Sequence, residues 1–431
     1  MKRRHFLQAA GTVLTSASLI SQVTKAETDN LLVKGDWTAF RKLFPLRDDR
    51  IQLATFLLAS HPEPVANAIQ KFRKELDYDP VIALVTHDGK VDEEVRNAAA
   101  AYMGGKGDQI ALTDSTTMGS AMVYSGLELA EGDEILHTTH DHYATFMAIE
   151  HRAQRTGAKV RQVAMYDNAA DTTVKDCVSR LEAAINPATK VVAVTWVHSS
   201  TGVKLPIRAL ADSIEKINAK RSAARQIIFC VDGVHGFGIE DVDVSELGCD
   251  FFIAGTHKWT FGPRGTGLVW GNDKGWEQSQ PVIPSFGNAF DVWLNKKSDS
   301  EVTWGDRMTP GGFHSFEHRW ALPAAFALHQ QLGKAKVQSR IHGLNTQVKE
   351  GLAKMPNVTL HTPMASELSS GLVAYEVSGK TPLETTYALF AKGLVSAPSP
   401  YHESYARMAP SLLNTEQELD TALAHVASIA S

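Results

Sequence analysis

The sequence predicts an α/β protein with a large domain on a mostly parallel seven-stranded sheet, followed by a small α+β C-terminal domain. Short apolar runs alternate with helical stretches along the middle of the chain, the pattern of an open sheet covered on both faces. With 431 residues, of which 43% are hydrophobic, the chain can bury such a core without disulfides or a structural metal. The seven expected strands are 109–112, 134–137, 160–163, 190–196, 227–231, 251–254 and 266–270.

Helical and strand-like stretches flank these runs. Amphipathic helices are expected at 36–50 and 64–76. The tail predicts helices at 322–332, 339–354, 383–391 and 415–429, and strand-like runs at 358–361, 372–377 and near Leu394. We therefore expect four parts: a signal peptide at 1–26, an N-terminal helical segment at 27–75 that packs with the small domain, a large domain at 76–310 and a small domain at 311–431.

Residues 1–26 have the features of an export signal. A basic start at Lys2, Arg3 and Arg4 precedes a mildly apolar stretch at 9–20 and a small-residue cleavage site at 24–26. The adjacent arginines followed by x-Phe-Leu resemble a twin-arginine signal, which implies the Tat export machinery and a periplasmic location. An ordinary amphipathic N-terminus of a cytosolic protein is the alternative. The apolar stretch is too short for a stable membrane helix, so no stable membrane insertion is expected.

Charge and cysteine content exclude several classes of protein. The formal net charge is -5, and removing the four basic residues of 1–26 leaves 39 basic against 48 acidic residues, a net charge of -9. No broad basic field remains, so nucleic acid is not an expected partner. Three cysteines are too few, and odd in number, for a disulfide framework.

Lys258 is the strongest chemical candidate. It follows the apolar run 251–254 and precedes the glycine-rich turn 262–267. Ligand sites in open α/β sheets lie at the carboxyl ends of the strands, where such a lysine would stand. A desolvated lysine is pushed toward its neutral form and becomes a nucleophile able to form a Schiff base, although a lysine after a strand is more often a surface charge.

Two further segments fit the same chemistry. Asp232 ends the run 227–231, and a buried carboxylate there can keep a pyridinium nitrogen protonated. The hydroxyl-rich turn 113–121 opens an apolar helix, whose N-terminus can hold a phosphate. Taken alone, Asp232 would be a turn acid and the hydroxyls an ordinary helix cap.

Together these segments resemble the class V aminotransferase family of pyridoxal phosphate (PLP) enzymes, of fold type I, and within it the isopenicillin N epimerase-like branch. The motifs occur in the family order over nearly the whole mature chain. The resemblance implies PLP as cofactor, no metal, a homodimer with the site at the subunit interface, and chemistry at the α carbon of an amino acid.

The resemblance also assigns roles to single residues. Lys258 would bind the PLP aldehyde and act as catalytic base, with Asp232 on the pyridine nitrogen. His142 would lie over the ring and His235 beside it, both with catalytic roles. The phosphate would be held by Thr117, Met118, Thr256 and His257.

Two family positions depart from the usual pattern. His198 and Ser199 stand where asparagines often lie next to the cofactor oxygen, and Phe313 and His314 stand where a Thr-Arg-like loop usually crosses the dimer interface.

Arg407 matches the family arginine that receives the substrate carboxylate, for which a planar guanidinium is suited; a surface arginine before a helix is the alternative.

The expected function is a PLP-dependent reaction at the α carbon of an amino acid or amino-acid residue in the periplasm, of aminotransferase, epimerase or decarboxylating type. This expected location and chemistry are similar to those of the exported PLP enzyme of pyoverdine maturation. Cysteine desulfuration is not expected, because it needs a mobile thiol and no cysteine follows Cys249. Two alternatives stay open. One is a metal-dependent hydrolase, because the 17 histidines include His137, His140 and His142, and also His314 and His318, at spacings that could ligate zinc. The other is a PLP-fold binding protein with weak catalysis.

Overall fold

A seven-stranded sheet forms the centre of the computed structural model, which describes residues 36–87 and 89–431. Its strand order is β2-β8-β7-β6-β5-β3-β4. Strands β3 to β7 run parallel, and β8 is antiparallel to both of its neighbours, so the expected mostly parallel sheet is confirmed. The strands are β2 (Ile110–Thr113), β3 (Glu134–Thr138), β4 (Lys159–Val163), β5 (Thr189–Thr195), β6 (Ile228–Asp232), β7 (Phe251–Gly255) and β8 (Gly267–Gly271).

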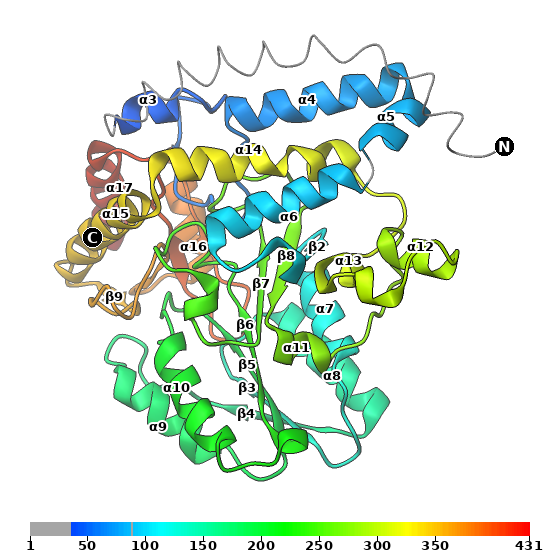
Figure 1. The fold of residues 1–431 in the computed structure, drawn as a ribbon. Helices are drawn as coiled ribbons and strands as arrows, with labels where there is room; N and C mark the ends of the chain where they lie inside the picture. The colour runs from blue at the N-terminus through cyan, green and yellow to red at the C-terminus, as the bar shows by residue number, and fades with distance from the viewer. Residues whose placement is uncertain (1–35, 88) are drawn as a thin grey trace.

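Both faces of this sheet are buried. Val192 and Val194 of β5 point into one apolar core, and Val191 and Ala193 point into the other, as the alternation of side chains along a strand requires. Helices cover both faces (Figure 1). On one side lie α7 (Thr116–Gly126), α8 (Tyr143–Thr156), α11 (Asp273–Glu277) and α13 (Trp304–Met308); on the other lie α6 (Lys90–Met103), α9 (Val174–Ala184), α10 (Ile207–Asn218) and α14 (Phe316–Leu332).

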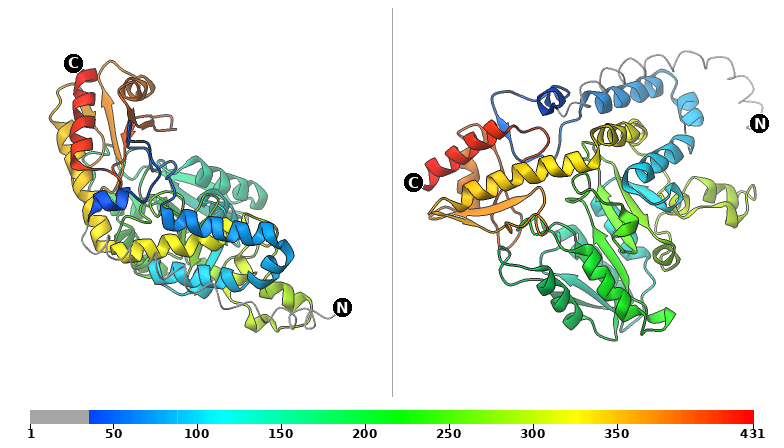
Figure 2. Two further views of the ribbon diagram at one scale, coloured as in Figure 1. Left: turned by 90° about the horizontal axis from the view of Figure 1, so that it is seen from above. Right: turned by 60° about the vertical axis from the view of Figure 1, so that its left-hand side comes forward.

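The C-terminal part forms a smaller α+β unit beside the large sheet (Figure 2). Its antiparallel sheet has the order β12-β13-β10-β9. The strands are β9 (Val358–Leu360), β10 (Val373–Val377), β12 (Ala397–Pro398) and β13 (Ala406–Met408), and they pack with α15 (Lys334–Ala353), α16 (Pro382–Phe390) and α17 (Glu416–Ala430).

Helix α15 joins the two units. Val337 and Ile341 in its first half pack in the core under the large sheet, whereas Leu344 and Val348 further on pack in the core of the small unit. The predicted division at 310/311 would place α14 with the small domain, yet its buried Phe326 lies in the core of the large sheet. The change in packing therefore falls within α15 rather than before α14.

The N-terminal segment differs from the expected pair of helices. The predicted helix 36–50 is wrong in length, because α3 spans only Trp37–Arg41 and then gives way to turns. Next comes β1 (Ile51–Gln52), which pairs in parallel with β11 (Leu394–Val395) of the small unit. Helix α4 (Glu63–Tyr78) packs on α14, and α5 (Pro80–His87) follows it. The segment thus contacts both units.

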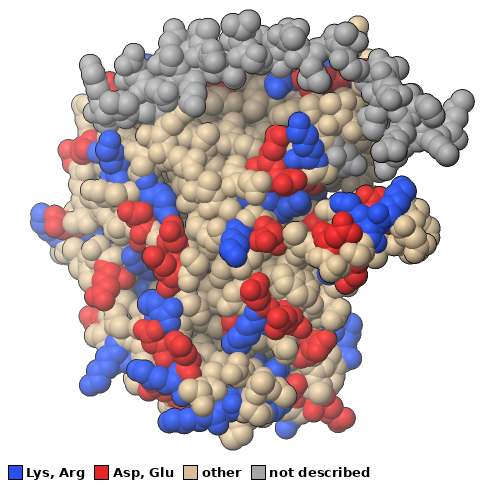
Figure 3. Space-filling view, in the orientation of Figure 1, with Lys and Arg blue, Asp and Glu red and all other residues tan. Residues whose placement is uncertain are grey.

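Charges of both signs are interspersed on the face shown in Figure 3. No helix within residues 36–87 and 89–431 is long and apolar enough to cross a membrane. The predicted signal at 1–26 lies outside the described residues.

A short helix, α12 (Asn288–Trp293), projects from the large unit next to α13.

Candidate active site

Asp232 and Lys258 meet at the carboxyl edge of the large sheet. Asp232 is the last residue of β6, and Lys258 lies in the turn that follows β7, the strand next to it. Parallel neighbours end at the same edge, which is why residues far apart in the sequence come together here. The structure therefore brings together the two residues that the sequence singled out most strongly.

The Lys258 amine contacts an imidazole whose protonation can be inferred. Lys258 Nζ lies 3.3 Å from His235 Nε2, and Trp259 Nε1 donates to His235 Nδ1 at 3.3 Å. Since Nδ1 accepts from the indole, the proton of a neutral ring sits on Nε2 and is directed at the lysine nitrogen. An amine that accepts a hydrogen bond from this N–H must itself be neutral. Burial lowers the pKa of Lys258 to about 8 and holds the pKa of His235 well below its usual value.

Asp232 is a buried carboxylate without a cationic partner at ion-pair distance among the described residues. Its Oδ1 accepts the Val234 N–H at 3.1 Å, and its Oδ2 lies 3.5 Å from the Thr145 hydroxyl on α8. Burial raises the pKa of Asp232 to about 6, although the Val234 N–H and the Lys258 charge favour the ionised form. A cationic ring nitrogen would supply the missing partner.

The turn that carries Lys258 is held from the N-terminal segment. Phe261 has a φ of 54°, a left-handed conformation that costs about 1–2 kcal/mol for an ordinary residue. Its ring packs edge-on against Phe44 at 5.0 Å between centroids and lies 5.9 Å from Phe40 of α3. The Ala59 N–H also donates to the His257 carbonyl at 3.1 Å. The segment before α4 thus fixes the conformation of the lysine turn.

The N-terminus of α7 lies beside this turn. Thr116, its first residue, accepts the Gly255 N–H at 2.8 Å through its hydroxyl. A Cβ built on Gly255 would lie 3.0 Å from both Thr116 Oγ1 and His257 Cε1, so these two side chains adjoin. Thr117 is exposed at the start of the helix. His257 therefore lies beside the N-terminus of α7, where Thr117 is the second residue, and the phosphate roles of both stay predictions. Thr116 is a neighbour that the sequence prediction missed.

Two of the predicted phosphate ligands are already bonded elsewhere. The Thr256 hydroxyl is fully buried and lies 2.5 Å from Thr266 Oγ1, facing the glycine turn rather than α7. The Met118 N–H donates to Ser115 Oγ, the N-cap of α7, at 3.1 Å. The phosphate prediction is corrected for Thr256, because its hydroxyl is hydrogen-bonded to the Thr266 hydroxyl. The backbone N–H of Met118 is likewise engaged, since it donates to the N-cap of α7.

His142 and Ser199 follow β3 and β5, two neighbouring strands of the same sheet. His142 is the N-cap of α8, where its Nδ1 accepts the Ala144 N–H at 3.2 Å. Its ring is exposed, which leaves a face on which another ring can stack. Ser199 follows β5 and is buried, with its hydroxyl 2.5 Å from the Tyr401 hydroxyl.

Arg407 is a buried cation without a counter-ion in the described part of the chain. It lies in β13 and is 2% exposed. Its Nη1 and Nη2 donate to the carbonyls of Ser199 at 2.7 Å and Pro398 at 2.8 Å, and its Nε has no partner. Phe56 lies under its guanidinium at 4.5 Å. Burial lowers the pKa of Arg407 to about 10. A buried charge without an opposite charge is costly, and an anionic ligand would offset that cost.

The sequence prediction also missed Tyr401 and Phe56. Both adjoin the site only through the tertiary fold: Tyr401 by its bond to Ser199, and Phe56 by its contacts with Arg407 and with His235 at 6.4 Å between centroids. Neither has a distinctive local motif, because the contacts join residues more than 140 positions apart. No signal within their own segments marked them.

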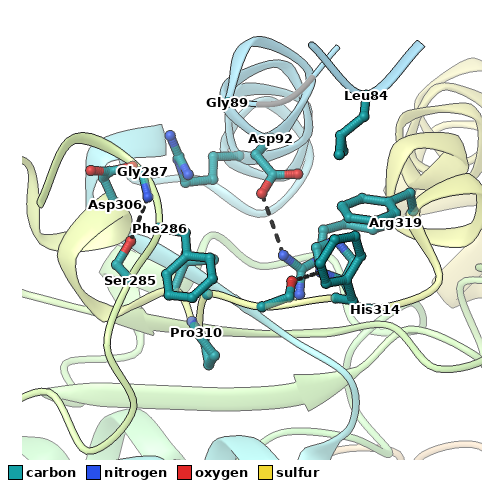
Figure 4. Close-up of a pocket in the computed structure, with 16 residues that line it drawn as sticks. Leu84, Gly89, Asp92, Ser285, Phe286, Gly287, Asp306, Pro310, His314 and Arg319 are labelled. Carbon is teal, nitrogen blue, oxygen red and sulfur yellow. Dashed lines mark hydrogen bonds and ion pairs between the residues drawn. The ribbon is translucent and has the colours of Figure 1, made fainter. Parts of the chain in front are cut away.

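A separate cavity of about 110 Å³ lies between α6, α13 and the loops that precede α12 and α14. Figure 4 shows Asp92 directed at Arg319, 3.3 Å away, with Phe286 and His314 beside them. Asp92 Oδ1, Asp306 Oδ2 and His314 Nε2 line the cavity and are buried without a hydrogen-bond partner among the described residues. The loop with Phe313 and His314 is the one that the resemblance places at a dimer interface, and Phe313 is 88% exposed.

The histidines of the metal alternative do not converge. His137 pairs with Asp141 at 3.2 Å, His140 stacks on Tyr166 at 4.5 Å, and His142 caps α8. Within residues 36–87 and 89–431, no three His, Cys, Asp or Glu side chains are grouped so as to hold a metal ion.

The fold and the site together define a class of protein: α/β enzymes that hold a PLP-type cofactor between a sheet-edge lysine and a buried carboxylate. The solved structures that this fold resembles include a C-DES variant with glycine covalently linked to PLP, at a TM-score of 0.80 and 21% identity, covering 90% of this chain and 98% of that one. The cysteine desulfurase CsdA of Escherichia coli superimposes at a TM-score of 0.74 with 21% identity, covering 92% and 98%.

Within that class, the chain belongs to the aminotransferase class-V family, whose profile matches residues 59–395. It is 26% identical over 401 residues to the isopenicillin N epimerase of Streptomyces clavuligerus, covering 89% of this chain and 96% of that protein. A probable cysteine desulfurase of Pyrococcus abyssi is 24% identical, covering 78% and 81%. The cofactor of the family, and of this chain, is PLP.

The described residues fit that group. Asp232 is a buried carboxylate that lacks a cation, Lys258 offers a neutral amine, and the N-terminus of α7 offers donors for a phosphate. These groups lie at one sheet edge, as the fold and the family require.

Proposed function

We propose that this protein is a PLP-dependent enzyme that makes or breaks a bond to the α carbon of an amino acid or of an amino-acid residue in a peptide. The observation that carries the proposal is the Lys258–His235 pair at 3.3 Å, together with the buried Asp232 and Arg407, neither of which has an opposite charge at ion-pair distance among the described residues. When bound, PLP supplies an electron sink for charge that develops at the α carbon.

The chain's own groups divide the work. Arg407 binds the substrate carboxylate, and Asp232 holds the ring nitrogen. Lys258, whose pKa of about 8 gives it a neutral fraction near physiological pH, removes or returns the proton at the α carbon, and the His235 Nε2–H is placed to donate a hydrogen bond to the neutral lysine nitrogen. Transamination, epimerisation and decarboxylation all use these groups. The match to an isopenicillin N epimerase, which covers 89% of this chain and 96% of that protein, supports an epimerase or aminotransferase type. If no turnover is found with any substrate, the result would favour a PLP-fold binding protein with weak catalysis.

One spectrum tests the proposal. The purified protein is expected to be yellow, with an imine absorbance that borohydride abolishes and that the Lys258→Ala variant lacks. A colourless protein that carries stoichiometric zinc would overturn it in favour of the metal-dependent hydrolase. Product mass analysis with amino acids and envelope peptides then identifies the bond that is changed.

We further propose that the protein is not a cysteine desulfurase, although several relatives are named as such. All three cysteines of the chain are buried, and burial raises the pKa of each thiol. Cys230 lies within β6 and Cys177 within α9, so neither can move to a substrate. Appreciable sulfide release from cysteine by the purified protein would contradict this assignment.

A periplasmic location is part of the proposal. It is supported by the Arg3-Arg4-x-Phe-Leu start, and the substrate would then be an amino compound, an envelope precursor or a siderophore-type peptide outside the cytoplasm. Replacing Arg3 and Arg4 with lysine should retain the protein in the cytoplasm, as fractionation would show. Export that is unaffected by this change would contradict a twin-arginine route.

A further inference from the structure

Tyr401 lies at the tip of a closed hairpin loop next to Arg407. The loop 399–405 joins β12 to β13, and its neck is closed by the Ser399 N–H donating to the Tyr405 carbonyl at 2.8 Å and the Tyr405 N–H donating to Ser399 Oγ at 2.9 Å. The neighbouring residues Pro400, His402 and Glu403 are exposed, whereas Tyr401 is partly buried. The hairpin therefore turns this one side chain of its tip toward the site.

Ser199 holds Tyr401 and Arg407 together. Its hydroxyl lies 2.5 Å from the Tyr401 hydroxyl, and its carbonyl accepts Arg407 Nη1 at 2.7 Å. The Tyr401 ring also lies edge-on to His142, 6.4 Å between centroids. A single buried residue after β5 thus sets the spacing between a phenol and a guanidinium.

This corner contains more hydrogen-bond donors than acceptors. A guanidinium carries more N–H groups than the two that the Ser199 and Pro398 carbonyls accept, and the buried Nε has no partner among the described residues. Ser199 and Tyr401 each carry one O–H group. One of these donates in the hydrogen bond between them, which leaves the other to donate to a ligand. A carboxylate, which only accepts, satisfies such a set of donors.

We propose that Tyr401 is a substrate-binding residue whose hydroxyl donates to the α-carboxylate of the amino-acid substrate alongside Arg407, while Ser199 donates to Tyr401 and orients it. This inference rests on the proposed function and adds a second recognition group to it. Burial raises the pKa of Tyr401 to about 12, so the phenol keeps its proton and remains a donor at physiological pH.

The test uses two small amines and the PLP-loaded protein. One is 2-aminoisobutyrate, which has a carboxylate and no α hydrogen to lose; the other is isopropylamine, the same amine without the carboxylate. Each is titrated against the PLP absorbance to give an apparent Kd. Tyr401→Phe is expected to weaken 2-aminoisobutyrate binding roughly tenfold or more, because a hydrogen bond to a charged group is lost, and to leave isopropylamine binding within about twofold.

Two further variants separate recognition from structure. Tyr405→Phe, in the same hairpin and stacked on His361 at 3.9 Å, should leave both titrations unchanged. Ser199→Ala keeps the carbonyl that holds Arg407 but removes the hydroxyl that orients Tyr401, so it should weaken 2-aminoisobutyrate less than Tyr401→Phe does. Ser199→Ala also provides the measurement if Tyr401→Phe does not fold.

The outcomes are distinct. The proposal is overturned if Tyr401→Phe binds 2-aminoisobutyrate as the wild type does. It is also overturned if Tyr401→Phe or Ser199→Ala weakens the binding of both amines equally. It is also overturned if the wild type shows no preference for the carboxylate-bearing amine. Absence of a borohydride-sensitive imine band before any amine is added would instead refute the proposed function itself.

Discussion

A lysine that loses its charge near pH 8 can serve both as a nucleophile toward an aldehyde and as a base at carbon. Burial is the main cause of the low pKa of Lys258, Asp232 opposes it, and Arg407 adds to it. His235 contributes a directed N–H because Trp259 occupies its other nitrogen. At the scale of single residues, the site is therefore an arrangement of buried groups whose charges are set by one another.

The pH dependence of PLP uptake follows from these groups. The neutral fraction of Lys258 rises with pH through about 8, so the rate of imine formation by the apoprotein should reach half its maximum near pH 8 rather than near 10.5. Asp232→Asn should lower this midpoint, because the Asp232 charge raises the pKa of Lys258. Arg407→Gln should raise the midpoint, because the Arg407 charge lowers that pKa. Stopped-flow absorbance over pH 6–11 measures it; a midpoint above pH 10 in the wild type would contradict the burial of the amine.

At the scale of elements, a helix cap and an aromatic contact hold the site. Ser115 caps α7 through the Met118 N–H, and Thr381 caps α16 in the small unit through the Glu384 N–H. Phe44 packs against the strained Phe261 in the turn of Lys258. Local sequence therefore determines where α7 starts, while a distant segment fixes the lysine turn.

The two caps should be equivalent for stability and different for cofactor binding. Ser115→Ala and Thr381→Ala should each lower the free energy of unfolding by about 1 kcal/mol, measured in urea. Only Ser115→Ala should weaken PLP binding, because it loosens the helix end next to Thr116 and Thr117. Equal effects of the two variants on PLP affinity would argue against a phosphate site at α7.

Removal of the aromatic contact should affect both stability and the lysine. Phe44→Ala should cost about 3–5 kcal/mol of stability and slow imine formation at Lys258, because Phe261 loses the packing that holds its left-handed conformation. The half-exposed Phe390, whose ring lies 4.4 Å from Arg50 Cζ, is the matched control, and Phe390→Ala should cost less than about 1 kcal/mol. Unchanged imine kinetics in a destabilised Phe44→Ala would show that the turn holds its own conformation.

At the scale of the whole molecule, exposed aromatic residues gather around α12 and the loop before α14. Phe286, Phe290 and Trp293 are solvent-exposed, Trp293 at 73%, and Phe313 lies in the adjoining loop at the cavity of Figure 4. Patches of this kind on a folded chain mark interaction surfaces. A homodimer, which the family resemblance implies, would supply a second copy to cover them.

Sedimentation should therefore show a dimer. Trp293→Glu should raise the dimer dissociation constant at least about tenfold, because interface aromatics contribute strongly to association. Leu383→Glu, an equally apolar exposed position on α16, should leave it unchanged. An active wild-type protein that sediments only as a monomer would contradict the dimer and leave the aromatic surface for another partner.

The sequence by itself determined the seven strands of the large sheet, the order of the small unit's main elements, and the two residues Lys258 and Asp232. These follow from local patterns, because apolar runs of strand length and the polar residues that end them are visible within a few positions. The Thr256 prediction failed, and Thr116, Phe56 and Tyr401 were missed, for the opposite reason. Whether a hydroxyl faces α7 or Thr266, and whether Tyr401 reaches Ser199 some 200 positions away, depends on how the small unit and the N-terminal segment pack on the sheet edge. Only the tertiary structure decided that, because contacts between distant segments are set by packing and not by local preference.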